Sequence, residues 1–447
     1  MDTFIITGGV PLRGDITLGG AKNVALKVLV ASLLTDEELV IENVPAICDV
    51  QLMTEVLESL GVKIQRKGDT LIARNSHADQ TRVPMELGAR LRTSSMVIGP
   101  LLARYGTAVI PNHGGCRIGA SPIDRHIRAL GRMGAVTDYR SGDGYYYATA
   151  LAGLVCTTVE FAKNSHTGTE TILLASVLAQ GTTIIKGAAQ EVEIDELISV
   201  LNAIGGKVRR GRSIGEIMIE GVPALHGTRY RVTPDRNEEV TFAIAAAVTN
   251  GSITVVGSQR RHLGAFLHAF TAAGGTYEAI DTNRTRYGRG EILRAVDIET
   301  KPHPGFMTDW QAPWAVLMTQ AHGRAVIHET VFENRFSYVA ELKKMGAHID
   351  FYDPVVPDQE ALYNFNWQDH REGDHHAIRV LGPSRLHNAM LTMHDLRAGA
   401  TLVLAALVAE GQSVLCGIEH IDRGYEKIEV RLRNLGAQIE RVKEEGV

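Results

Sequence analysis

The sequence has 447 residues, which is too long for one ordinary hydrophobic core and predicts two large domains or a repeat architecture. Apolar residues make up 45% and charged residues 22%, as in ordinary globular proteins, and the net charge of -5 argues against a general nucleic-acid binder. No segment is long and apolar enough to span a bilayer, and the start lacks the pattern of a signal peptide. We therefore predict a cytoplasmic protein that binds neither nucleic acid nor membrane.

The four cysteines, Cys48, Cys116, Cys156 and Cys416, lie far apart and form no C-x-x-C pair. This spacing predicts neither a disulfide framework nor a zinc site. We accordingly expect no metal and no cofactor.

One short phrase recurs along the chain: a helix-like run that ends at a glycine and leads into a strand-like segment. It occurs at residues 59–64, 132–136, 203–208, 273–277, 344–349 and 434–439. The first glycines stand at 61, 134, 205, 274, 346 and 436, so the intervals are 73, 71, 69, 72 and 90. A near-constant interval predicts an internal repeat.

A second phrase, an alanine-rich helix that ends at a glycine before a β-branched strand, follows the same period. Its glycines stand at 106, 181, 251, 323 and 411, and Thr35-Asp36-Glu37-Glu38 takes the place of the glycine in the first copy. Each unit is therefore predicted to be helix, glycine stop, strand, second helix, glycine stop, strand, with the glycine in the left-handed position that ends a helix. Six such units must pack together, and two groups of three suit this length.

The last interval is long by about twenty residues, and the surplus lies between residues 353 and 376. This stretch is polar, aromatic and out of period, so we interpret it as a loop insertion. Its histidines, with Asp369 and Asp374, leave metal binding open as an alternative to an exposed loop.

Polar residues recur where the first helix of each unit is expected to begin. They are Ala21-Lys22-Asn23, Leu91-Arg92-Thr93-Ser94, Ser165-His166-Thr167-Gly168-Thr169, Asn237-Glu238-Glu239, Thr308-Asp309-Trp310-Gln311 and His394-Asp395-Leu396-Arg397. Several suit N-caps, but Lys22, Arg92 and Arg397 oppose the helix dipole. We expect these cations to gain their counter-charge from a bound anion shared with the free backbone N–H groups. With Arg335 and Arg423, helix ends of two domains facing one cleft would bind a substrate carrying phosphate and carboxylate groups.

Residues 112–124 contain Gly114-Gly115-Cys116-Arg117-Ile118-Gly119, where the glycines permit sharp turns and movement, as in a lid. Arg117 and nearby His113 would stabilise the reactive thiolate of Cys116. The alternative is a surface turn with an unreactive cysteine.

Six ordered motifs together resemble the UDP-N-acetylglucosamine 1-carboxyvinyltransferases, a group of enolpyruvyl transferases. They are Gly20-Ala21-Lys22-Asn23, Gly114-Gly115-Cys116 with Ile118-Gly119-Ala120, Thr308-Asp309 with Gln311-Ala312, the run from Glu329 to Phe336, Asp395-Leu396-Arg397-Ala398, and the run from His420 to Glu426. The similarity covers essentially the whole chain outside the 353–376 insertion. The sister group that acts on 3-phosphoshikimate typically has Gly-Ser-Lys-Ser in the first motif and lacks the cysteine loop.

The resemblance implies an α/β fold of two inside-out α/β barrel domains, each built from three βαβαββ-type units. One domain would span residues 22–232 and carry the Cys116 loop, while residues 1–21 and 233–447 would form the other and carry the insertion. The first strand would complete this second domain, so the chain would cross twice between the domains. We expect a monomer, although the sequence leaves the oligomeric state open.

The resemblance also implies the reaction: transfer of the enolpyruvyl group of phosphoenolpyruvate to the 3′-hydroxyl of UDP-N-acetylglucosamine, with release of phosphate. Cys116 would be the acid at the methylene carbon and Asp309 the base near the sugar hydroxyl. Lys22 and Arg423 would bind the phosphate, and Arg335 and Arg397 the carboxylate. The remaining substrate-binding positions implied by the family are Asn23, Arg92, Pro122, Asp124, Lys163, Ser165, Thr167, Val331 and Asp395.

Some positions depart from the family pattern. Ser121 stands where an arginine is usual, and we hypothesise that Arg117 takes over its work; Ser165-His166-Thr167 replaces a Ser-Val-Gly at the diphosphate segment. Two alternatives therefore stay open: a paralogue that acts on another nucleotide sugar, and a catalytically silent nucleotide-sugar-binding regulator that uses the 353–376 insertion as a docking surface.

Overall fold

The computed structural model describes residues 2–75, 80–112 and 123–443, which divide into two compact units. Unit 1 contains residues 2–19 and 234–443, and unit 2 contains residues 20–75, 80–112 and 123–233. Strands of the described residues form six small sheets, three in each unit.

One sequence of elements recurs in both units, and it is most complete at residues 158–220. There the chain order is β9 (Thr158–Glu160), α6 (His166–Ser176), β10 (Thr182–Lys186), α7 (Val192–Ala203), β11 (Lys207–Arg210) and β12 (Ile217–Glu220). β9 runs parallel to β10, whereas β12 pairs antiparallel with both β10 and β11. The predicted βαβαββ repeat is confirmed.

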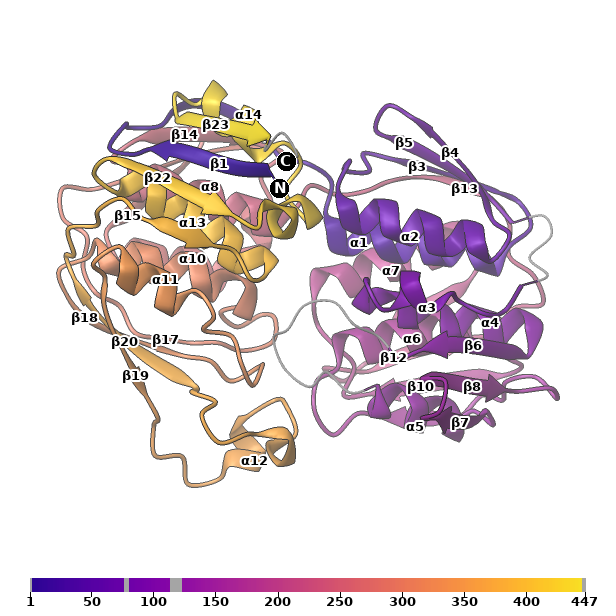
Figure 1. Cartoon of the computed structure of the whole chain (residues 1–447). Helices are drawn as coiled ribbons and strands as arrows, with labels where there is room; N and C mark the ends of the chain where they lie inside the picture. The colour runs from indigo at the N-terminus through magenta and orange to yellow at the C-terminus, as the bar shows by residue number, and fades with distance from the viewer. Residues whose placement is uncertain (1, 76–79, 113–122, 444–447) are drawn as a thin grey trace. The chain divides into compact units, whose positions relative to one another are not determined.

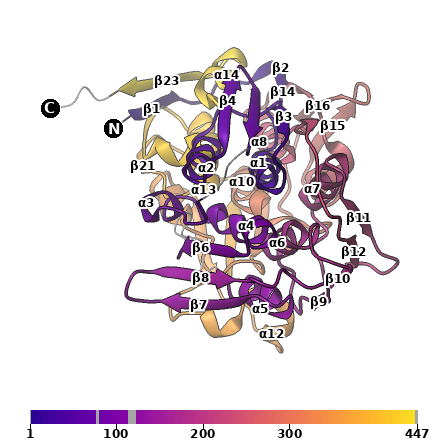
Figure 2. The ribbon, with the colours of Figure 1, turned by 90° about the vertical axis from the view of Figure 1, so that its right-hand side faces the viewer.

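The other elements of unit 2 form two further copies. They are α1 (Lys22–Ala31), η1 (Ser32–Leu34), β3 (Glu38–Glu42), α2 (Cys48–Ser59), β4 (Lys63–Lys67), β5 (Thr70–Arg74), α3 (Met85–Gly88), η2 (Arg92–Val97), α4 (Ile98–Tyr105), β6 (Thr107–Pro111), α5 (Asp124–Arg132), β7 (Val136–Arg140), β8 (Tyr145–Thr149) and β13 (Thr228–Arg231). The sheets have the orders β13-β3-β5-β4 and β6-β8-β7. Figure 2 shows β3 and β4 on one side and β6, β7 and β8 on another side of unit 2, with α1, α2 and α4 between them.

Unit 1 contains the remaining three copies. Two of them comprise β2 (Arg13–Thr17), α8 (Arg236–Val248), β14 (Ser252–Val256), η3 (Arg260–His262), α9 (Gly264–Ala272), β15 (Gly275–Ala279), β16 (Arg284–Arg289), β17 (Ile298–Glu299), α10 (Thr308–Thr319), β18 (Gly323–His328), α11 (Val339–Lys344), β19 (His348–Tyr352), α12 (Gln359–Leu362), η4 (Trp367–Asp369) and β20 (Ala377–Gly382). Their sheets have the orders β15-β16-β14-β2 and β17-β18-β20-β19.

The third copy of unit 1 takes one strand from the start of the chain. It comprises β21 (Met390–Thr392), α13 (Leu396–Val408), β22 (Gln412–Cys416), η5 (Ile418–Arg423), α14 (Ile428–Asn434), β23 (Gln438–Lys443) and β1 (Asp2–Thr7). β1 lies between β22 and β23 and is antiparallel to both, with Phe4 opposite Leu415 on one side and Arg441 on the other. The first strand thus completes the last repeat (Figure 1).

Within the described residues, the chain passes between the units twice, each time after a strand that belongs to a sheet of the unit it leaves. β2 pairs in parallel with β14 of unit 1, and the chain then enters unit 2 at α1. β13 pairs in parallel with β3 of unit 2, and the chain then returns to unit 1 at α8.

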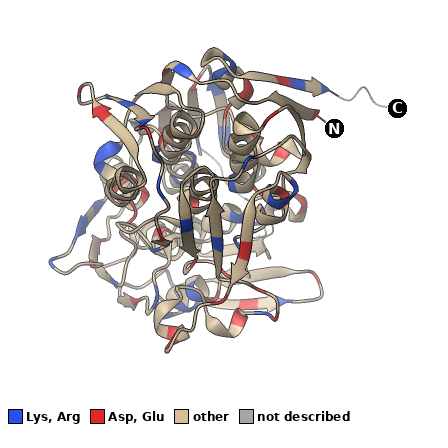
Figure 3. Ribbon diagram, turned by 90° about the vertical axis from the view of Figure 1, so that its left-hand side faces the viewer, with Lys and Arg blue, Asp and Glu red and all other residues tan. Residues whose placement is uncertain are grey.

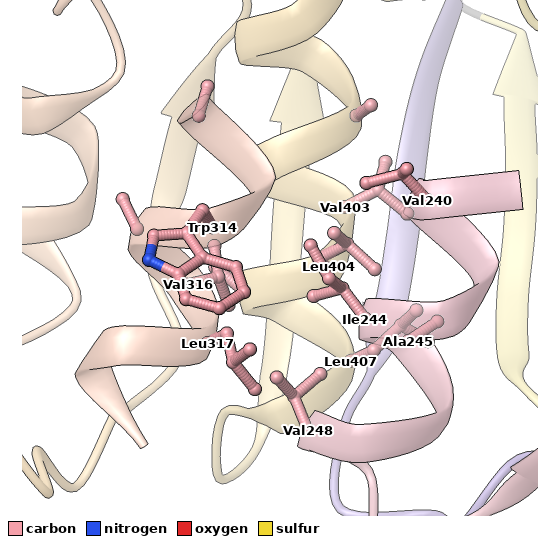
Figure 4. Close-up of a cluster of buried hydrophobic side chains, with 14 of the residues drawn as sticks. Val240, Ile244, Ala245, Val248, Trp314, Val316, Leu317, Val403, Leu404 and Leu407 are labelled. Atoms are coloured by element: carbon pink, nitrogen blue, oxygen red, sulfur yellow. The ribbon is translucent and has the colours of Figure 1, made fainter. Parts of the chain in front are cut away.

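The hydrophobic core of unit 1 is built around three helices that contact one another, α8, α10 and α13. Every residue of α8 is buried, so this helix has no solvent-facing side and must be surrounded by other elements. Figure 4 shows its Ile244 beside Leu404 of α13, with Trp314 of α10 facing them. Each Val, Leu or Ile side chain buried in this way contributes roughly 1.5–3 kcal/mol. The helices therefore lie inside and the sheets outside, as the inside-out barrel requires.

The glycine stops of the first phrase follow the prediction. Glycines 61, 134, 205, 274, 346 and 436 all have positive φ, between 88° and 97°. In the second phrase only Gly106 ends its helix directly, because α6, α10 and α13 already end at Ser176, Thr319 and Val408. At the predicted stop Gly251, however, Asn250 adopts the left-handed conformation, with φ of 52°. Gly251 is needed for another reason, because a Cβ there would lie 2.1 Å from the carbonyl oxygen of Leu12.

Charged residues of both signs are interspersed along the ribbon in Figure 3. Among the described residues, the helices are all too short or too polar to cross a bilayer.

Candidate active site

The polar residues predicted to begin the first helix of each unit do so. α1 begins at Lys22, η2 at Arg92, α6 at His166, α8 at Arg236, α10 at Thr308 and α13 at Leu396. Side chains cap three of these helices: Ser165 caps α6, Asp235 caps α8 and Asp395 caps α13 through two backbone N–H groups. The starts of α1, η2 and α10 have no side-chain cap.

In unit 1, the carboxylate of Asp309 at the start of α10 lies between two arginines. Its Oδ1 accepts a hydrogen bond of 2.6 Å from Arg335, and its Oδ2 accepts one of 3.5 Å from Arg397. The side chains of Arg335 and Arg397 are only 5% and 8% exposed, and that of Asp309 is 22% exposed. This Asp309–Arg335–Arg397 cluster carries one surplus positive charge when all three groups are ionised.

Arg397 is fixed from a second direction by Tyr425, whose hydroxyl oxygen accepts a hydrogen bond of 3.0 Å. That hydroxyl also lies 2.7 Å from Thr241 Oγ1. Burial lowers the pKa of Arg397, but Asp309, Tyr425 and Asp235 together outweigh this effect and raise the pKa overall. Arg397 is therefore a permanent cation with a fixed orientation.

A buried carboxylate, Glu329, organises the backbone beside this cluster. Its Oε2 accepts hydrogen bonds from Thr308 at 2.8 Å and Gln311 at 3.3 Å, both in the first turn of α10. Its Oε1 accepts backbone N–H bonds from Val331 and Phe332, at 2.8 and 3.1 Å. Burial raises the pKa of Glu329, while the nearby charge of Arg335 acts in the opposite direction.

The other predicted residues of unit 1 lie on neighbouring segments. Val331 is half-buried on the loop after β18, and Asp395 is the buried cap of α13, where its Oδ2 also accepts a hydrogen bond of 2.7 Å from Ser337. Arg423 ends η5, two residues before Tyr425. The roles of Glu329 and Tyr425 were not predicted, although both stand within the six motifs.

In unit 2, Lys22 at the start of α1 is paired with Asp49 in the first turn of α2. The Nζ–Oδ2 distance is 2.9 Å, and the two side chains are 15% and 3% exposed. The expectation that these cations gain a counter-charge only from a bound anion is wrong for Lys22, Arg335 and Arg397, because carboxylates of the protein already supply one. No spacing in the sequence pointed to Asp49.

The predicted nucleotide-binding positions of unit 2 lie near the starts of α5 and α6. Asp124 begins α5 and is paired with Arg128 one turn later. Thr167 lies in the first turn of α6, with its Oγ1 3.0 Å from Nε2 of His126. Other predicted positions of unit 2 are half-buried: Asn23, Arg92, Lys163 and Ser165.

A charged cluster that sequence reasoning missed lies at the start of α6. Glu170 is fully buried, with its Oε1 3.3 Å from Lys27 Nζ and 3.0 Å from His166 Nε2. Burial lowers the pKa of His166, but the charge and hydrogen bond of Glu170, together with the charge of Glu191, outweigh this and raise it to about 9. His166 is thus a cation at neutral pH rather than only added bulk.

Three predicted site residues, Cys116, Arg117 and Pro122, lie outside the described residues, as do His113 and Ser121. Within the described ranges, His, Cys, Asp and Glu side chains form no group of three that suits a metal ion.

Solved structures of known proteins share this architecture over nearly the whole chain. The enolpyruvyl transferase NikO from Streptomyces tendae matches with a TM-score of 0.84 at 24% identity, and covers 99% of both chains. EPSP synthase from Acinetobacter baumannii matches with a TM-score of 0.72 at 18% identity, over 99% of this chain and 100% of that one. The fold is that of the enolpyruvyl transferases.

Sequence comparison is more specific. The model of the family described as EPSP synthase (3-phosphoshikimate 1-carboxyvinyltransferase) matches residues 6–432. Relatives named UDP-N-acetylglucosamine 1-carboxyvinyltransferase include one from Gluconacetobacter diazotrophicus, 43% identical over 99% of this chain and 100% of its own, and one from Solibacter usitatus, 41% identical with the same coverage. The chain belongs to the EPSP synthase family of enolpyruvyl transferases, and its resemblance to the UDP-N-acetylglucosamine branch is confirmed.

Proposed function

We propose that this protein transfers the enolpyruvyl group of phosphoenolpyruvate to the 3′-hydroxyl of UDP-N-acetylglucosamine and releases phosphate. The identity of 43% with a relative of that name, over 99% of the chain, is the observation that carries the proposal. In a bacterial cell this reaction is the first committed step of peptidoglycan synthesis, and so contributes to cell-wall biogenesis, cell shape and division. We further propose a cytoplasmic monomer.

The reaction needs an acid, a base and fixed cations. The base removes the proton of the sugar hydroxyl while its oxygen bonds to C2 of phosphoenolpyruvate, and the acid delivers a proton to C3. The tetrahedral adduct then loses a proton from C3 and the C–O bond to phosphate breaks, which restores the double bond.

In our proposal, Asp309 is the base or proton relay at the sugar hydroxyl, and Cys116 is the acid. The position of Asp309 between Arg335 and Arg397 supports this role, because the two guanidinium groups fix the orientation of the carboxylate. Arg335 and Arg397 would also bind the substrate carboxylate through N–H groups turned away from Asp309.

Lys22 and Arg423 are proposed to bind the phosphate of phosphoenolpyruvate. Lys22 is held by a single carboxylate oxygen of Asp49, and its ammonium group has three donors, so a phosphate oxygen can be bound without loss of the ion pair. The proposed phosphate site therefore keeps its cation in place before substrate binds.

Asn23, Pro122, Asp124, Lys163, Ser165, Thr167 and Val331 are proposed to bind the nucleotide sugar. Arg117 is proposed to supply the phosphate contact of the missing arginine at position 121, and Arg92 and Asp395 are proposed as further substrate-binding residues. Ser165 and Thr167 at the start of α6 support a diphosphate contact, because backbone N–H groups at a helix start bind phosphate.

The test is phosphate release from phosphoenolpyruvate with a panel of UDP-sugars as acceptors. UDP-N-acetylglucosamine should give the highest kcat/KM, and Asp309→Asn should lose most of the turnover. A higher kcat/KM with another UDP-sugar would favour the paralogue alternative. No release with any acceptor would refute the proposed activity and favour a silent regulator.

A further inference from the structure

The 353–376 insertion joins β19 to β20, where other copies of the repeat have short turns. The corresponding connections are residues 68–69, 141–144, 211–216 and 280–283. The insertion leaves and re-enters the sheet where Tyr352 pairs with Ala377, and Ala377 pairs with His328, the last residue of β18. It therefore begins and ends at the same end of the sheet as the loop 329–335, and Figure 1 shows its helix α12 below this sheet.

The insertion has a small core of its own, so the expectation of an exposed loop is wrong for its aromatic residues. Tyr363, Phe365 and His376 are 2%, 5% and 4% exposed. The ring of Tyr363 stacks on Trp367 with centroids 5.0 Å apart, and Trp367 stacks on His370 at 4.6 Å. Because these rings pack against one another, Tyr363 and Phe365 are not available to dock a partner protein.

His376 and His370 form the polar part of this core. Its Nε2 lies 3.0 Å from Nδ1 of His370, and burial together with the neighbouring His370 lowers the pKa of His376 to about 4. At neutral pH the imidazole of His376 is therefore uncharged, and the core of the insertion stays intact.

Three contacts join this core to the start of the loop 329–335. The backbone N–H of Glu329 donates to the carbonyl oxygen of His376 at 2.7 Å, and that of Asn364 donates to the carbonyl oxygen of Thr330 at 2.8 Å. The hydroxyl of Tyr363 lies 3.2 Å from Nε2 of His328, and the two rings meet edge to face. The insertion thus holds both residues that precede Val331.

The same loop is held from the other side by the Glu329 carboxylate, which binds the N–H groups of Val331 and Phe332 and the first turn of α10. That turn carries Asp309, and the loop continues to Arg335. A shift of the braced residues would therefore move Val331, whereas Arg335, four residues further along, is held separately by its pair with Asp309.

We propose that the 353–376 insertion is a positioning element that fixes the loop 329–335 for the acceptor sugar nucleotide, with Tyr363 as its principal contact residue. The inference rests on the proposed function for the identity of the acceptor. The contacts by which the insertion holds the loop do not depend on the proposed function. Val331 is the proposed acceptor contact in the braced segment, so the insertion acts on acceptor binding and leaves the phosphoenolpyruvate groups in place.

The test compares Tyr363→Phe, which removes the hydroxyl bonded to His328, and Tyr363→Ala, which removes the ring. Val355→Ser is the matched control, because Val355 belongs to the same insertion and is 96% exposed. Tyr363→Ala should raise KM for UDP-N-acetylglucosamine about tenfold, since the loop loses stabilisation equal to roughly one hydrogen bond. Both kcat and KM for phosphoenolpyruvate should stay within about twofold of wild type. Tyr363→Phe should lie between wild type and Tyr363→Ala.

Hydrogen exchange gives a readout that does not depend on turnover. Amide protons of Glu329, Val331 and Phe332 should exchange faster in Tyr363→Ala than in Val355→Ser, while those of α8 stay protected. Unchanged exchange in this loop would overturn the proposal. Similar rises in KM for both substrates together with an equal fall in kcat would also overturn it, because they would indicate a general structural defect. If wild type fails to use UDP-N-acetylglucosamine, the proposed function fails, and the exchange comparison still decides whether the insertion braces the loop.

Discussion

Substitution of Asp309 by asparagine tests the central charge arrangement of unit 1. The change keeps the size of the side chain and one carbonyl acceptor, but it removes the negative charge between Arg335 and Arg397. The surplus charge of the Asp309–Arg335–Arg397 cluster rises from one to two. Because both guanidinium groups are buried, water compensates for the loss only in part.

The cost follows from the two hydrogen bonds. A bond to a charged group contributes about 1.5–3 kcal/mol and a neutral one about 0.5–1.5 kcal/mol, so each of the two contacts loses about 1–1.5 kcal/mol. The contact with Arg397 is long at 3.5 Å and contributes less. We therefore expect Asp309→Asn to lower the free energy of unfolding by about 2 kcal/mol, measured by urea denaturation.

Catalysis should fall much further than stability. Loss of a positioned base lowers kcat by about 10²- to 10⁴-fold. KM for phosphoenolpyruvate should not rise, because the added surplus charge favours an anion. Steady-state phosphate release at varied phosphoenolpyruvate concentration separates the two parameters.

The matched control is Glu42→Gln in unit 2, whose carboxylate also pairs with two arginines, Arg229 and Arg231. Those arginines are 67% and 65% exposed, so this change should cost less than about 1 kcal/mol and leave kcat unchanged. If Asp309→Asn keeps kcat within about tenfold of wild type, or raises KM for phosphoenolpyruvate as strongly as it lowers kcat, Asp309 is not the base.

Three further outcomes are expected. The raised pKa of His166, about 9 against 6.5 for the ordinary imidazole, means that its pair with Glu170 stabilises the fold fully below pH 6.5 and loses this effect as the pH rises to about 9. The melting temperature of wild type should therefore fall more over this range than that of His166→Gln; equal decreases would contradict the ion pair. Lys22→Met should destabilise the chain by about 3 kcal/mol in urea because it takes a cation from buried Asp49, and adding Asp49→Asn should recover part of the loss; no recovery would mean that the pair is not coupled. An epoxide phosphonate should alkylate Cys116 rather than another cysteine, as mass spectrometry of the digested protein would show.

The fold could be predicted largely because its signals are local. A glycine that ends a helix needs a left-handed backbone, and this requirement recurs at Gly61, Gly205 and Gly436 with the same φ of 97°. The signals that mark the starts of the first helices are also local, since caps such as Ser165 and Asp395 act within one turn. Repetition of these signals was enough to predict six units.

Contacts between distant segments could not be predicted in the same way. Asp49 meets Lys22 because α2 packs beside α1, and Glu170 meets Lys27 because α6 and α1 both pack against α7 and η2. Neither pair has a spacing that marks it in the sequence. The packing of Tyr363 against His328 is of the same kind, since an aromatic residue in an irregular segment suits an exposed loop and a small core equally well.

The cations at the helix starts show why the chemistry was predicted better than the electrostatics. A lysine or arginine opposes the helix dipole there, and the sequence alone suggests that only a ligand could compensate. Lys22 and Arg397 instead each meet a carboxylate of the protein, so part of their charge is already compensated before substrate arrives. A substrate anion must then share these cations with Asp49 and Asp309, which favours ligands that can use the remaining N–H donors without breaking the existing pairs. Multidentate anions such as phosphate and carboxylate meet this requirement, and phosphoenolpyruvate carries both.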